Sequence, residues 1–427
     1  MKDKVFMSRR KMKGFPLLVS VEEALSSLAE KTSIGQPAAE NVPLEESLGR
    51  YCAVDVVSPV NVPSFDRSAV DGYAVRAVDT FGASPTNPVA LSLVGSSMAG
   101  MKRSQMPRLG PGQAVEIYTG ASIPEGADSV VMAEYVRKQG EGLIEVMRQT
   151  HPLQNVSRVG EDYREGEVVV EKGVRIRSWH IGALASLNIT EIPVFRRLRM
   201  GVLSTGGELV EPGGNLEEGK VVNSSKPMLK ALITENGCVA VDLGTVEDDL
   251  DVVASRISEG LKAVDMLIVT GGTSVGEKDI VPEAVNRVGE PGVVFHGVRI
   301  RPAKPTGAGV VNGKPVFMLS GYPVSAMIGF TLFVKPFIDK AYSRKTSIPS
   351  RVRGRLTRRI PNQALTRSFI RVRVEKTPLG FVVEPLMLTG SGLLSTLTKA
   401  NAILVIPEDV EGYDEGEEVE VELLTPD

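Results

Sequence analysis

Hydrophobic and polar positions change their spacing several times along this chain. Residues Ser20 to Glu23 form the capping-box pattern Ser-x-x-Glu, and apolar residues then recur every three or four positions through Ala29. This spacing predicts an amphipathic helix that begins at Ser20. Between about residues 42 and 150 the pattern becomes a series of short β-type runs separated by proline and glycine. Residues 139–142, between two such runs, predict a hairpin turn.

After residue 196 short apolar strands alternate with helical segments. Strands are predicted at 200–204, 239–243, 266–270 and 316–319, and helices at 226–235, 250–262, 282–287 and 323–342. Alternation of β and α with short connections predicts a parallel sheet that helices cover on both faces. From about residue 345 the pattern returns to β. The chain therefore divides into a helical lead, a β-rich block, an α/β block and a β-rich tail.

Composition excludes several classes of protein. The 427 residues predict two to four domains. A formal charge of -3 and an aromatic content of 5% supply neither a general basic field nor a stacking platform for nucleic acid. Cys52 and Cys238 are far apart, and His151, His180 and His296 are scattered. A thiolate cluster, a zinc site or a Ser-His-Asp triad is therefore not expected.

The sequence predicts no membrane segment and no secretory signal. No window approaches the roughly 18 consecutive apolar residues of a membrane span. Residues 1–14 are basic, and the apolar run at 15–21 is too short for the core of a signal peptide and contains Pro16. We therefore predict a cytoplasmic protein whose basic start is a solvated tail.

Three strand ends in the α/β block carry loops that combine glycine with hydroxyl and carboxyl groups. These loops contain Thr205, Gly206, Gly207, Glu208, Asp248, Gly271, Gly272, Ser274 and Asp279. In parallel sheets, ligands bind outside the carboxyl ends of the strands, where backbone N–H groups can cradle an oxyanion. Clustered carboxylates could hold Mg²⁺ there against phosphate oxygens. The alternative that each loop is an ordinary tight connection stays open, and Asp249 is better explained as a helix N-cap.

Two nucleotide-binding motifs were tested against these loops and fail. Residues 271–276 have the glycine spacing of a Walker A loop, but Glu277, Lys278 and Asp279 follow where Lys-Ser/Thr is required. The hydroxyl that binds Mg²⁺ is missing, and the lysine is one position late. The first strand of the block is not followed by Gly-x-Gly-x-x-Gly. The pattern therefore excludes both a P-loop hydrolase and a Rossmann dehydrogenase.

Three further segments are candidates for binding. Residues 298–305 carry three cations and two prolines, which suits an anion, although a solvated edge strand protected by charge and proline explains them equally well. The turn at 319–325 leads from a strand into a helix that begins with proline, and it is a further candidate oxyanion site. In the β-rich block, residues 63–74 place charged and hydroxyl groups between apolar anchors. Burying such groups is costly unless the loop faces solvent or a ligand.

Taken together, these segments resemble the molybdopterin molybdenumtransferase family, which includes the MoeA proteins and the gephyrin E-domain. The matching segments lie in order at residues 65–74, 118–131, 160–162, 204–209, 270–279, 301–305, 321–326 and 400–412. Each motif alone is weak, whereas their joint order and spacing over nearly the whole chain are highly specific.

The resemblance implies a multidomain fold of α/β and β class. The subunit is expected to be elongated and to form homodimers. The expected parts are a helical and β lead domain split between residues 15–50 and 151–196, a β-rich insert domain at 51–150, a doubly wound α/β molybdopterin-binding domain at 197–342, and a C-terminal β-barrel-like domain at 343–427. The α/β domain is expected to be similar to the molybdopterin adenylyltransferases. The insert of one subunit is expected near the α/β cleft of the other.

The resemblance also implies a reaction of molybdenum cofactor biosynthesis, in which a transferase inserts molybdate into adenylylated molybdopterin and releases AMP with the help of Mg²⁺. The implied catalytic residues are Asp71, Glu208, Asp248, Asp279 and Lys304, and Glu208, Asp248 and Asp279 are the implied metal ligands. The implied substrate-binding residues are Ser68, Thr119, Asp162, Thr205, Gly271, Gly272, Ser274, Arg301, Pro305, Ser325, Arg371 and Ser391. Ser68 and Asp71 are expected to come from the partner subunit, and Arg371 and Ser391 from the C-terminal tail.

The chain departs from the family pattern at several of these positions. Gly207 stands where the family has Asp, Arg301 where it has Lys, Ser320 where it has Pro, Tyr322 where it has Asn, and Val70 where it has Met. Arginine presents a planar fork rather than a point charge. These departures leave open the choice between molybdate and tungstate, the number of metal ions, and whether the chain is a non-catalytic cofactor-binding paralogue or scaffold.

Two further expectations concern partners and the neighbouring reaction. An adenylyltransferase that acts one step earlier is a third interpretation, and it is disfavoured because such enzymes do not need flanking β-rich domains. A contact with the molybdopterin adenylyltransferase is expected, whereas nucleic acid and membrane partners are not.

Overall fold

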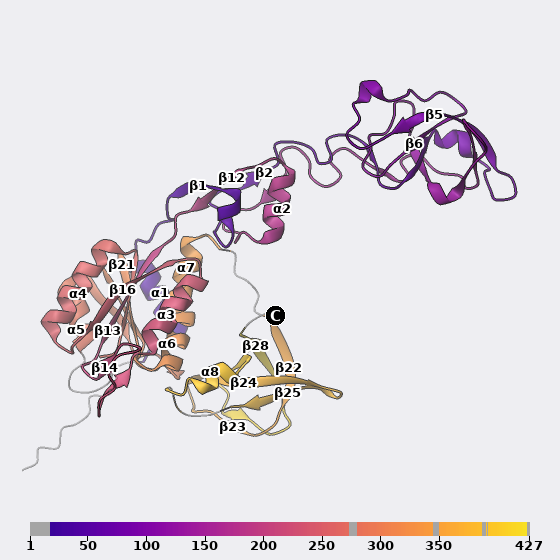
Figure 1. The fold of residues 1–427 in the computed structure, drawn as a ribbon. Helices are drawn as coiled ribbons and strands as arrows, with labels where there is room; N and C mark the ends of the chain where they lie inside the picture. Colours follow the sequence, from indigo (N-terminus) through magenta and orange to yellow (C-terminus); the bar gives the residue numbers. More distant parts are fainter. Residues whose placement is uncertain (1–17, 273–279, 345–349, 387–389, 391, 425–427) are drawn as a thin grey trace, which may run out of the picture.

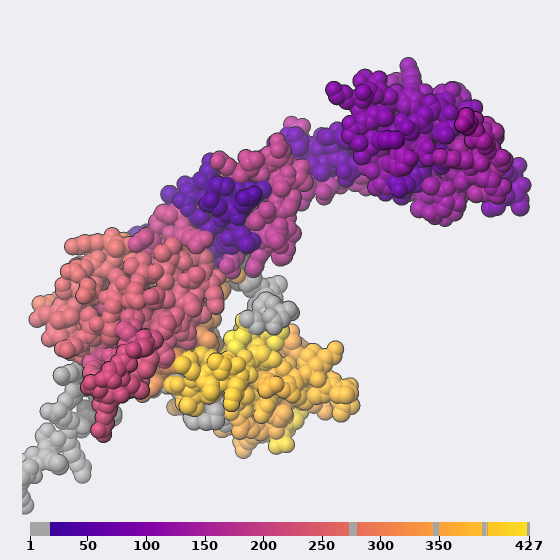
Figure 2. All heavy atoms as spheres, viewed as in Figure 1, coloured from indigo at the N-terminus to yellow at the C-terminus, as the bar shows by residue number. Residues whose placement is uncertain are grey.

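The described residues form several bodies that are laid out along an elongated molecule (Figures 1 and 2). The computed structural model describes residues 18–272, 280–344, 350–386, 390 and 392–424. A β-rich body lies at one end, a small lead region connects it to an α/β body, and a β body lies beside the α/β body. No helix in these described ranges is long and apolar enough to cross a membrane.

The α/β body is built on a six-stranded sheet of mixed direction. In spatial order its strands are β16 (Val239–Val246), β13 (Arg199–Thr205), β17 (Met266–Thr270), β21 (Lys314–Leu319), β20 (Gly307–Val311) and β18 (Pro291–His296). The first four strands are parallel, as the sequence predicts, and the last two are antiparallel. The antiparallel pair was not predicted, because glycine and proline made it resemble a loop. A Cβ at Gly309 would lie 2.6 Å from Val285, so glycine is needed where a helix packs closely on β20.

Helices cover both faces of this sheet. Along β17, Met266 and Ile268 face the cluster formed with α3 (Ser225–Glu235), whereas Leu267 and Val269 face α4 (Leu250–Ala263) and α5 (Ile280–Val288). All four side chains are fully buried, and each contributes about 1.5–3 kcal/mol by leaving water. The predicted helix at 323–342 is a continuous run of α6 (Pro323–Gly329), a π-helical turn η5 (Phe330–Val334) and α7 (Lys335–Ala341).

The first helix of the chain, α1 (Val21–Lys31), packs on the α/β body. Its capping box is confirmed, because Ser20 Oγ accepts from Glu23 N at 3.1 Å and Glu23 Oε2 accepts from Ser20 N at 2.8 Å. Val21, Ala24 and Leu28 join the core cluster on the face of the sheet that α3 covers. Within residues 15–50, this helix therefore packs on the α/β body, whereas the next strand, β1 (Ala39–Pro43), pairs with β12 (Glu191–Phe195) in the lead region.

The lead region joins two segments that lie far apart in sequence. β1 (Ala39–Pro43) pairs with β12 (Glu191–Phe195), and β2 (Val56–Val57) pairs with β11 (Val168–Val170), both antiparallel. A short 3-10 turn, η1 (Leu44–Ser47), and helix α2 (Ser178–Ser186) complete it. The β-rich body is inserted between these two segments of chain (Figure 1).

The β-rich body contains a six-stranded sheet. In spatial order its strands are β7 (Ser129–Met132), β4 (Gly72–Val75), β6 (Gln113–Ile117), β5 (Val89–Ser97), β9 (Leu143–Val146) and β8 (Val136–Lys138). The predicted hairpin turn at 139–142 is confirmed, since β8 and β9 are antiparallel and Gly140 and Gly142 have positive φ. Outside the sheet lie β3 (Arg67–Ser68), which pairs with β10 (Val156–Ser157), and the turns η2 (Ala77–Thr80), η3 (Arg103–Gln105) and η4 (Ala133–Tyr135).

The C-terminal region closes into a barrel of five strands, as expected. The strands are β24 (Arg367–Thr377), β25 (Gly380–Pro385), β22 (Arg351–Leu356), β28 (Glu418–Leu423) and β26 (Ala402–Ile406), with β26 pairing back to β24. Closure leaves no free sheet edge among them. The small pair β23 (Ile360–Pro361) and β27 (Gly412–Tyr413) and helix α8 (Ser395–Lys399) lie beside the barrel. β19 (Ile300–Arg301) leaves the α/β body to pair with β24, which ties the two bodies together.

Candidate functional site

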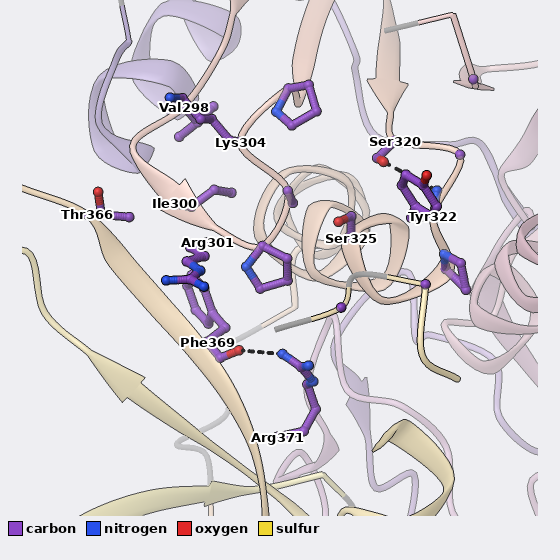
Figure 3. A pocket seen from close by; sticks show the side chains of 18 of the residues that line it. Val298, Ile300, Arg301, Lys304, Ser320, Tyr322, Ser325, Thr366, Phe369 and Arg371 are labelled. Carbon is purple, nitrogen blue, oxygen red and sulfur yellow. Dashed lines mark hydrogen bonds between the residues drawn. The ribbon is translucent and has the colours of Figure 1, made fainter. Parts of the chain in front are cut away.

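A pocket of about 1080 Å³ lies at the carboxyl ends of β13, β17 and β21 (Figure 3). Thr205, Gly271 and Ser320 mark these three strand ends, and all of them line the pocket. The opposite wall comes from β24 of the barrel, through Phe369 and Arg371. The pocket is therefore shared by the α/β body and the barrel, at the edge of the sheet where parallel strands bind ligands.

The cationic segment at 298–305 forms one wall of this pocket. Val298 N donates to Lys304 O at 2.9 Å, which closes a tight loop, and Ala303 inside it has a φ of 77°. The side chains of Arg301 and Lys304 are exposed on the wall of the pocket. The segment is an edge strand, as the alternative explanation required, but its edge is paired with the barrel and its charges lie at a cavity.

Arg371 adds a third cation from the barrel side. It is 3% exposed, and its guanidinium donates to Thr396 Oγ1 at 3.2 Å and to Phe369 O at 3.3 Å (Figure 3). Burial, and secondly the positive charge of Arg301, lower the pKa of Arg371. A buried guanidinium beside like charges is favoured when an anion shares the site. The pocket is therefore suited to a strongly anionic ligand.

Two close approaches explain the glycines at the end of β17. Gly271 has a φ of 90°, and a Cβ there would lie 2.1 Å from Thr205 O. A Cβ at Gly272 would lie 3.1 Å from Thr205 Oγ1 and 3.7 Å from Asp248 Oδ1. Only glycine lets the β13 and β17 loops meet in this way. The backbone of Gly271 and Gly272 is thereby exposed to the pocket.

Of the three carboxylates expected to hold a metal ion together, the structure describes two, and only Glu208 of these lines the pocket. Glu208 is exposed and lines the pocket, whereas Asp248 is exposed beside it and accepts a hydrogen bond from Thr205 Oγ1. Asp279, the third implied metal ligand, lies outside the described residues. Among the residues that the structure describes, no three acidic, histidine or cysteine side chains are grouped for a metal ion. Mg²⁺ needs only one or two carboxylates when substrate phosphates complete its shell, so Glu208 and Asp248 fit that role.

The turn after β21 gives the pocket a polar floor and an aromatic rim. Ser320 and Ser325 are buried, and Ser320 Oγ accepts from Tyr322 N at 3.3 Å (Figure 3). The Tyr322 ring is 61% exposed at the pocket, and its edge faces Gly392 of the barrel side. Three of the positions that depart from the family pattern, Arg301, Ser320 and Tyr322, thus line the pocket.

A second polar cluster lies in the β-rich body. Asp71 Oδ1 accepts from both the backbone N and the Oγ1 of Thr119, each at 2.7 Å, and these hydrogen bonds lower the pKa of Asp71. Ser68 is buried nearby in sequence and donates to Val70 O. The Asp71 carboxylate is exposed and ionised at neutral pH, so it presents a fixed negative charge to solvent.

The structure brings together most, but not all, of the expected site residues. Those that line the pocket are Thr205, Glu208, Gly271, Gly272, Arg301, Lys304, Pro305, Ser325 and Arg371. Ser68, Asp71 and Thr119 belong to the β-rich body, which lies at the opposite end of the molecule from the α/β body (Figure 1), and Asp162 N donates to Val62 O at 3.0 Å. Ser274, Asp279 and Ser391 lie outside the described residues. A single chain therefore forms the pocket without the insert residues.

The sequence reasoning missed one wall of the pocket. Leu209, Val221 and Val222, in the parallel pair β14 (Leu209–Val210) and β15 (Val221–Val222), line it, as do Asn223 and Ser224 just before α3. The polar run at 223–226 is a typical helix start and could have indicated this position. The short strands themselves are too small to show a period.

Three family profiles cover most of the chain. The MoeA N-terminal region (domain I and II) matches residues 19–188, the probable molybdopterin binding domain matches residues 201–340, and the MoeA C-terminal region (domain IV) matches residues 353–424. The boundaries of the three matches leave only short stretches unassigned.

Similar proteins match over nearly their whole length. A molybdopterin molybdenumtransferase of Bacillus subtilis is 36% identical over 409 residues, which is 95% of this chain and 94% of that protein. A molybdopterin molybdenumtransferase of Haemophilus influenzae is 33% identical over 415 residues, covering 95% and 98%. The crystal structure of a molybdopterin biosynthesis MoeA protein from Pyrococcus horikoshii OT3 superposes with a TM-score of 0.83 at 35% identity, covering 95% of this chain and 100% of that one.

Proposed function

This chain belongs to the MoeA family of molybdopterin molybdenumtransferases of molybdenum cofactor biosynthesis, and we propose that its α/β–barrel pocket is where molybdate meets adenylylated molybdopterin. The observation that carries the proposal is the gathering of Arg301, Lys304 and Arg371 around one pocket at the carboxyl ends of the strands. Both substrates are anions, and three cations from two bodies provide complementary charge for them.

In the chemical step, water attacks the phosphoanhydride, which releases AMP and leaves the phosphate on molybdopterin. The two dithiolene sulfurs bind molybdenum in place of one oxide of molybdate, which leaves as water with the two thiol protons. Cleavage of a phosphoanhydride is accelerated mainly by positioning and by stabilising the charge that develops on phosphate oxygens. Lys304 and Arg301 are exposed to the pocket and can supply that charge, while the backbone of Gly271 and Gly272 can donate hydrogen bonds. Arg371, held by Thr396, gives a fixed cation on the opposite wall for molybdate or phosphate.

Glu208 and Asp248 are the described residues that would hold Mg²⁺ in this proposal. When bound, the ion would neutralise phosphate charge next to the bond that breaks. Thr205 orients Asp248 through its hydroxyl, and the exposed Glu208 reaches the pocket directly. Glu208 and Asp248 would thus both be ligands of Mg²⁺, and water and phosphate oxygens would complete its coordination.

We also propose that the working form is a homodimer in which the insert of one copy reaches the pocket of the other. Asp71, with Thr119 and Ser68 beside it, is an ionised group held in a fixed orientation, yet it belongs to the β-rich body, which lies at the opposite end of the molecule from the α/β body (Figure 1). A two-fold dimer would bring two such clusters to two pockets. A cytoplasmic location and a transient contact with the adenylyltransferase that makes the substrate belong to the same proposal.

The test is release of AMP from adenylylated molybdopterin by the purified protein. We expect AMP release that depends on Mg²⁺ and on an oxyanion, together with cofactor that activates a molybdenum-free apoenzyme. Parallel reactions with molybdate, with tungstate and without oxyanion separate the choice of metal from simple hydrolysis. Binding of the intact nucleotide with no AMP released under any of these conditions would show a non-catalytic binding protein instead.

A further inference from the structure

One wall of the pocket is formed by a short pair of strands that projects from the α/β body. We define the arm as residues 209–222, which contain β14, β15 and the exposed connection 211–220 between them. Leu209, Val221 and Val222 of the arm line the pocket, and the arm projects from the α/β body (Figure 1). The connection is exposed throughout, so the arm needs a fastening to keep its apolar side chains at the pocket.

Lys226, in the first turn of α3, provides that fastening. Its side chain is only 6% exposed, and its Nζ lies 2.6 Å from Glu211 Oε1 of the arm and 3.2 Å from Asp242 Oδ1 of β16. Thr245 Oγ1, also on β16, donates to the same Glu211 oxygen at 2.6 Å. The hydrogen bonds from Lys226 and Thr245 lower the pKa of Glu211, so this contact is charged at neutral pH. A buried ammonium is costly unless its partners are in place, so the carboxylates and the lysine hold one another.

Two backbone contacts transmit this position to the pocket. Val221 N donates to Glu208 O at 2.9 Å, and Asn223 N donates to Val210 O at 2.8 Å. Glu208, which lines the pocket, lies in the turn before β14 and three residues before Glu211. Ser225, which directly precedes Lys226 at the start of α3, donates from its Oγ to Gly321 O at 2.7 Å, and Gly321 is next to Tyr322. The start of α3 is thus joined to the arm, to Glu208 and to the turn after β21.

We propose that Lys226 is a positioning residue that fastens the arm against the pocket and thereby sets the affinity for adenylylated molybdopterin. The affinity part of this inference rests on the proposed function, whereas the fastening does not. Lys226 does not touch the ligand in this account; it acts through Glu211. A nearby lysine, Lys230, offers a matched control, because its Nζ binds the same Asp242 at 2.9 Å and, among the described residues, no hydrogen bond or ion pair joins its side chain to the arm.

The experiment compares the full-length wild type with Lys226→Met, Lys226→Arg, Glu211→Gln and Lys230→Met. Trypsin cleavage after Lys220, in the exposed connection, reports release of the arm without any ligand. We expect the rate of this cleavage, followed by mass spectrometry, to rise at least tenfold in Lys226→Met, about threefold in Glu211→Gln, and less than twofold in Lys230→Met. Melting temperature is measured beside it, to separate arm release from general unfolding.

The kinetic readout is the KM for adenylylated molybdopterin in the AMP-release assay. We expect Lys226→Met to raise KM at least fivefold with kcat within threefold of wild type, Lys226→Arg to restore most of the affinity, and Lys230→Met to match wild type. Unchanged cleavage at Lys220 in both Lys226→Met and Glu211→Gln would overturn the fastening, and faster cleavage with unchanged KM would overturn its role in binding. If Lys226→Met does not fold, Glu211→Gln decides both the fastening of the arm and its role in binding, because Glu211 is the half-exposed partner of this ion pair.

The two proposals fail in different ways. A wild type that releases no AMP contradicts the proposed function, and the cleavage rates then still decide whether Lys226 fastens the arm. A wild type that releases AMP, with Glu211→Gln and Lys226→Met equal to it in cleavage and in KM, contradicts only the role of Lys226.

Discussion

The α/β–barrel pocket and the β-rich insert both carry residues that the family resemblance assigns to one site, but the chain builds them in different ways. In the pocket, groups from three strand ends and from the barrel converge on one cavity, and several are buried or bound to buried groups. In the insert, the Asp71 carboxylate is exposed and accepts two hydrogen bonds from Thr119. The described residues of one chain form the pocket, whereas the insert cluster is an oriented charge on an exposed surface.

This difference indicates how the two regions should respond to substitution. A residue at the pocket can change binding, catalysis and the local fold together. A residue of the exposed insert cluster should change activity without changing stability, because little packing depends on it. Substitutions at matched positions in the two regions therefore test whether they serve one site.

The largest effect is expected for Lys304→Ala. This substitution removes an exposed cation from the pocket wall, so kcat/KM for AMP release should fall at least 100-fold, equivalent to about 3 kcal/mol of transition-state stabilisation. The melting temperature should stay within about 2 °C, since no core packing is lost. Lys262→Ala, an exposed lysine of α4, is the control and should match wild type in both measurements. Activity equal to wild type in Lys304→Ala would place the chemistry elsewhere.

A smaller loss is expected for Asp71→Asn in the insert. Asparagine can still accept from Thr119, so only the charge is removed, and we expect kcat/KM to fall roughly 10- to 100-fold with an unchanged melting temperature. The control is Asp79→Asn in the same body, because Asp79 accepts from Gly112 N at 2.8 Å as part of the local fold. That variant should retain wild-type kinetics. If Asp71→Asn also does so, the insert takes no part in the reaction.

Much of the pocket could be predicted from the sequence because its parts are local. The strand ends at Thr205 and Gly271 and the cap at Asp249, whose side chain accepts from Val252 N, follow from apolar runs that end in glycine or a capping residue. The apolar run at 266–270 predicts a strand in a sheet covered on both faces, and the structure places alternate residues of β17 in two core clusters. These features depend on neighbours within a few positions.

The remaining features depend on contacts between distant segments. Phe369 and Arg371 reach the pocket because β19 pairs with β24 across more than sixty positions. No period reveals this pairing, so Arg371 was expected at the site only through the family resemblance, and Phe369 was not expected. The fastening of Glu211 by Lys226 similarly joins a loop to a helix start. β18 and β20 were missed because glycine, which favours turns in isolation, allows close packing there. Because Asp71 is exposed, its surroundings in one chain do not indicate which surface of a second copy it would contact.

The smallest effect concerns the contribution of Asp242, in the α/β body, to stability at low pH. Burial raises the pKa of Asp242, but hydrogen bonds from Lys230, Gly244 N and Lys226 outweigh it and lower the pKa to about 2. With an unfolded value of 3.8, this carboxylate contributes stability above about pH 4, and the contribution is lost as the pH falls towards 2. Because its side chain is 38% exposed, we expect only about 1 kcal/mol.

The measurement is urea unfolding of wild type and Asp242→Asn between pH 6 and pH 2.5. The difference in unfolding free energy between the two proteins should be largest near pH 6 and should shrink as the pH falls below 4. Asp79→Asn in the insert serves as the comparison from the other region. A difference for Asp242→Asn that stays constant over the whole range would show that its charge does not stabilise the α3 side of the pocket.

The central claim, that one site combines the pocket of one copy with the insert of another, is tested most directly by mixing two variants. Lys304→Ala and Asp71→Asn, each poorly active alone, are unfolded together, refolded and assayed for AMP release. In a two-fold dimer, random pairing makes half of the dimers mixed, and each mixed dimer regains one intact site of two, so the mixture should recover about a quarter of wild-type activity. Activity no higher than the mean of the separate variants would contradict the account, because it would mean that each pocket works without the partner's insert.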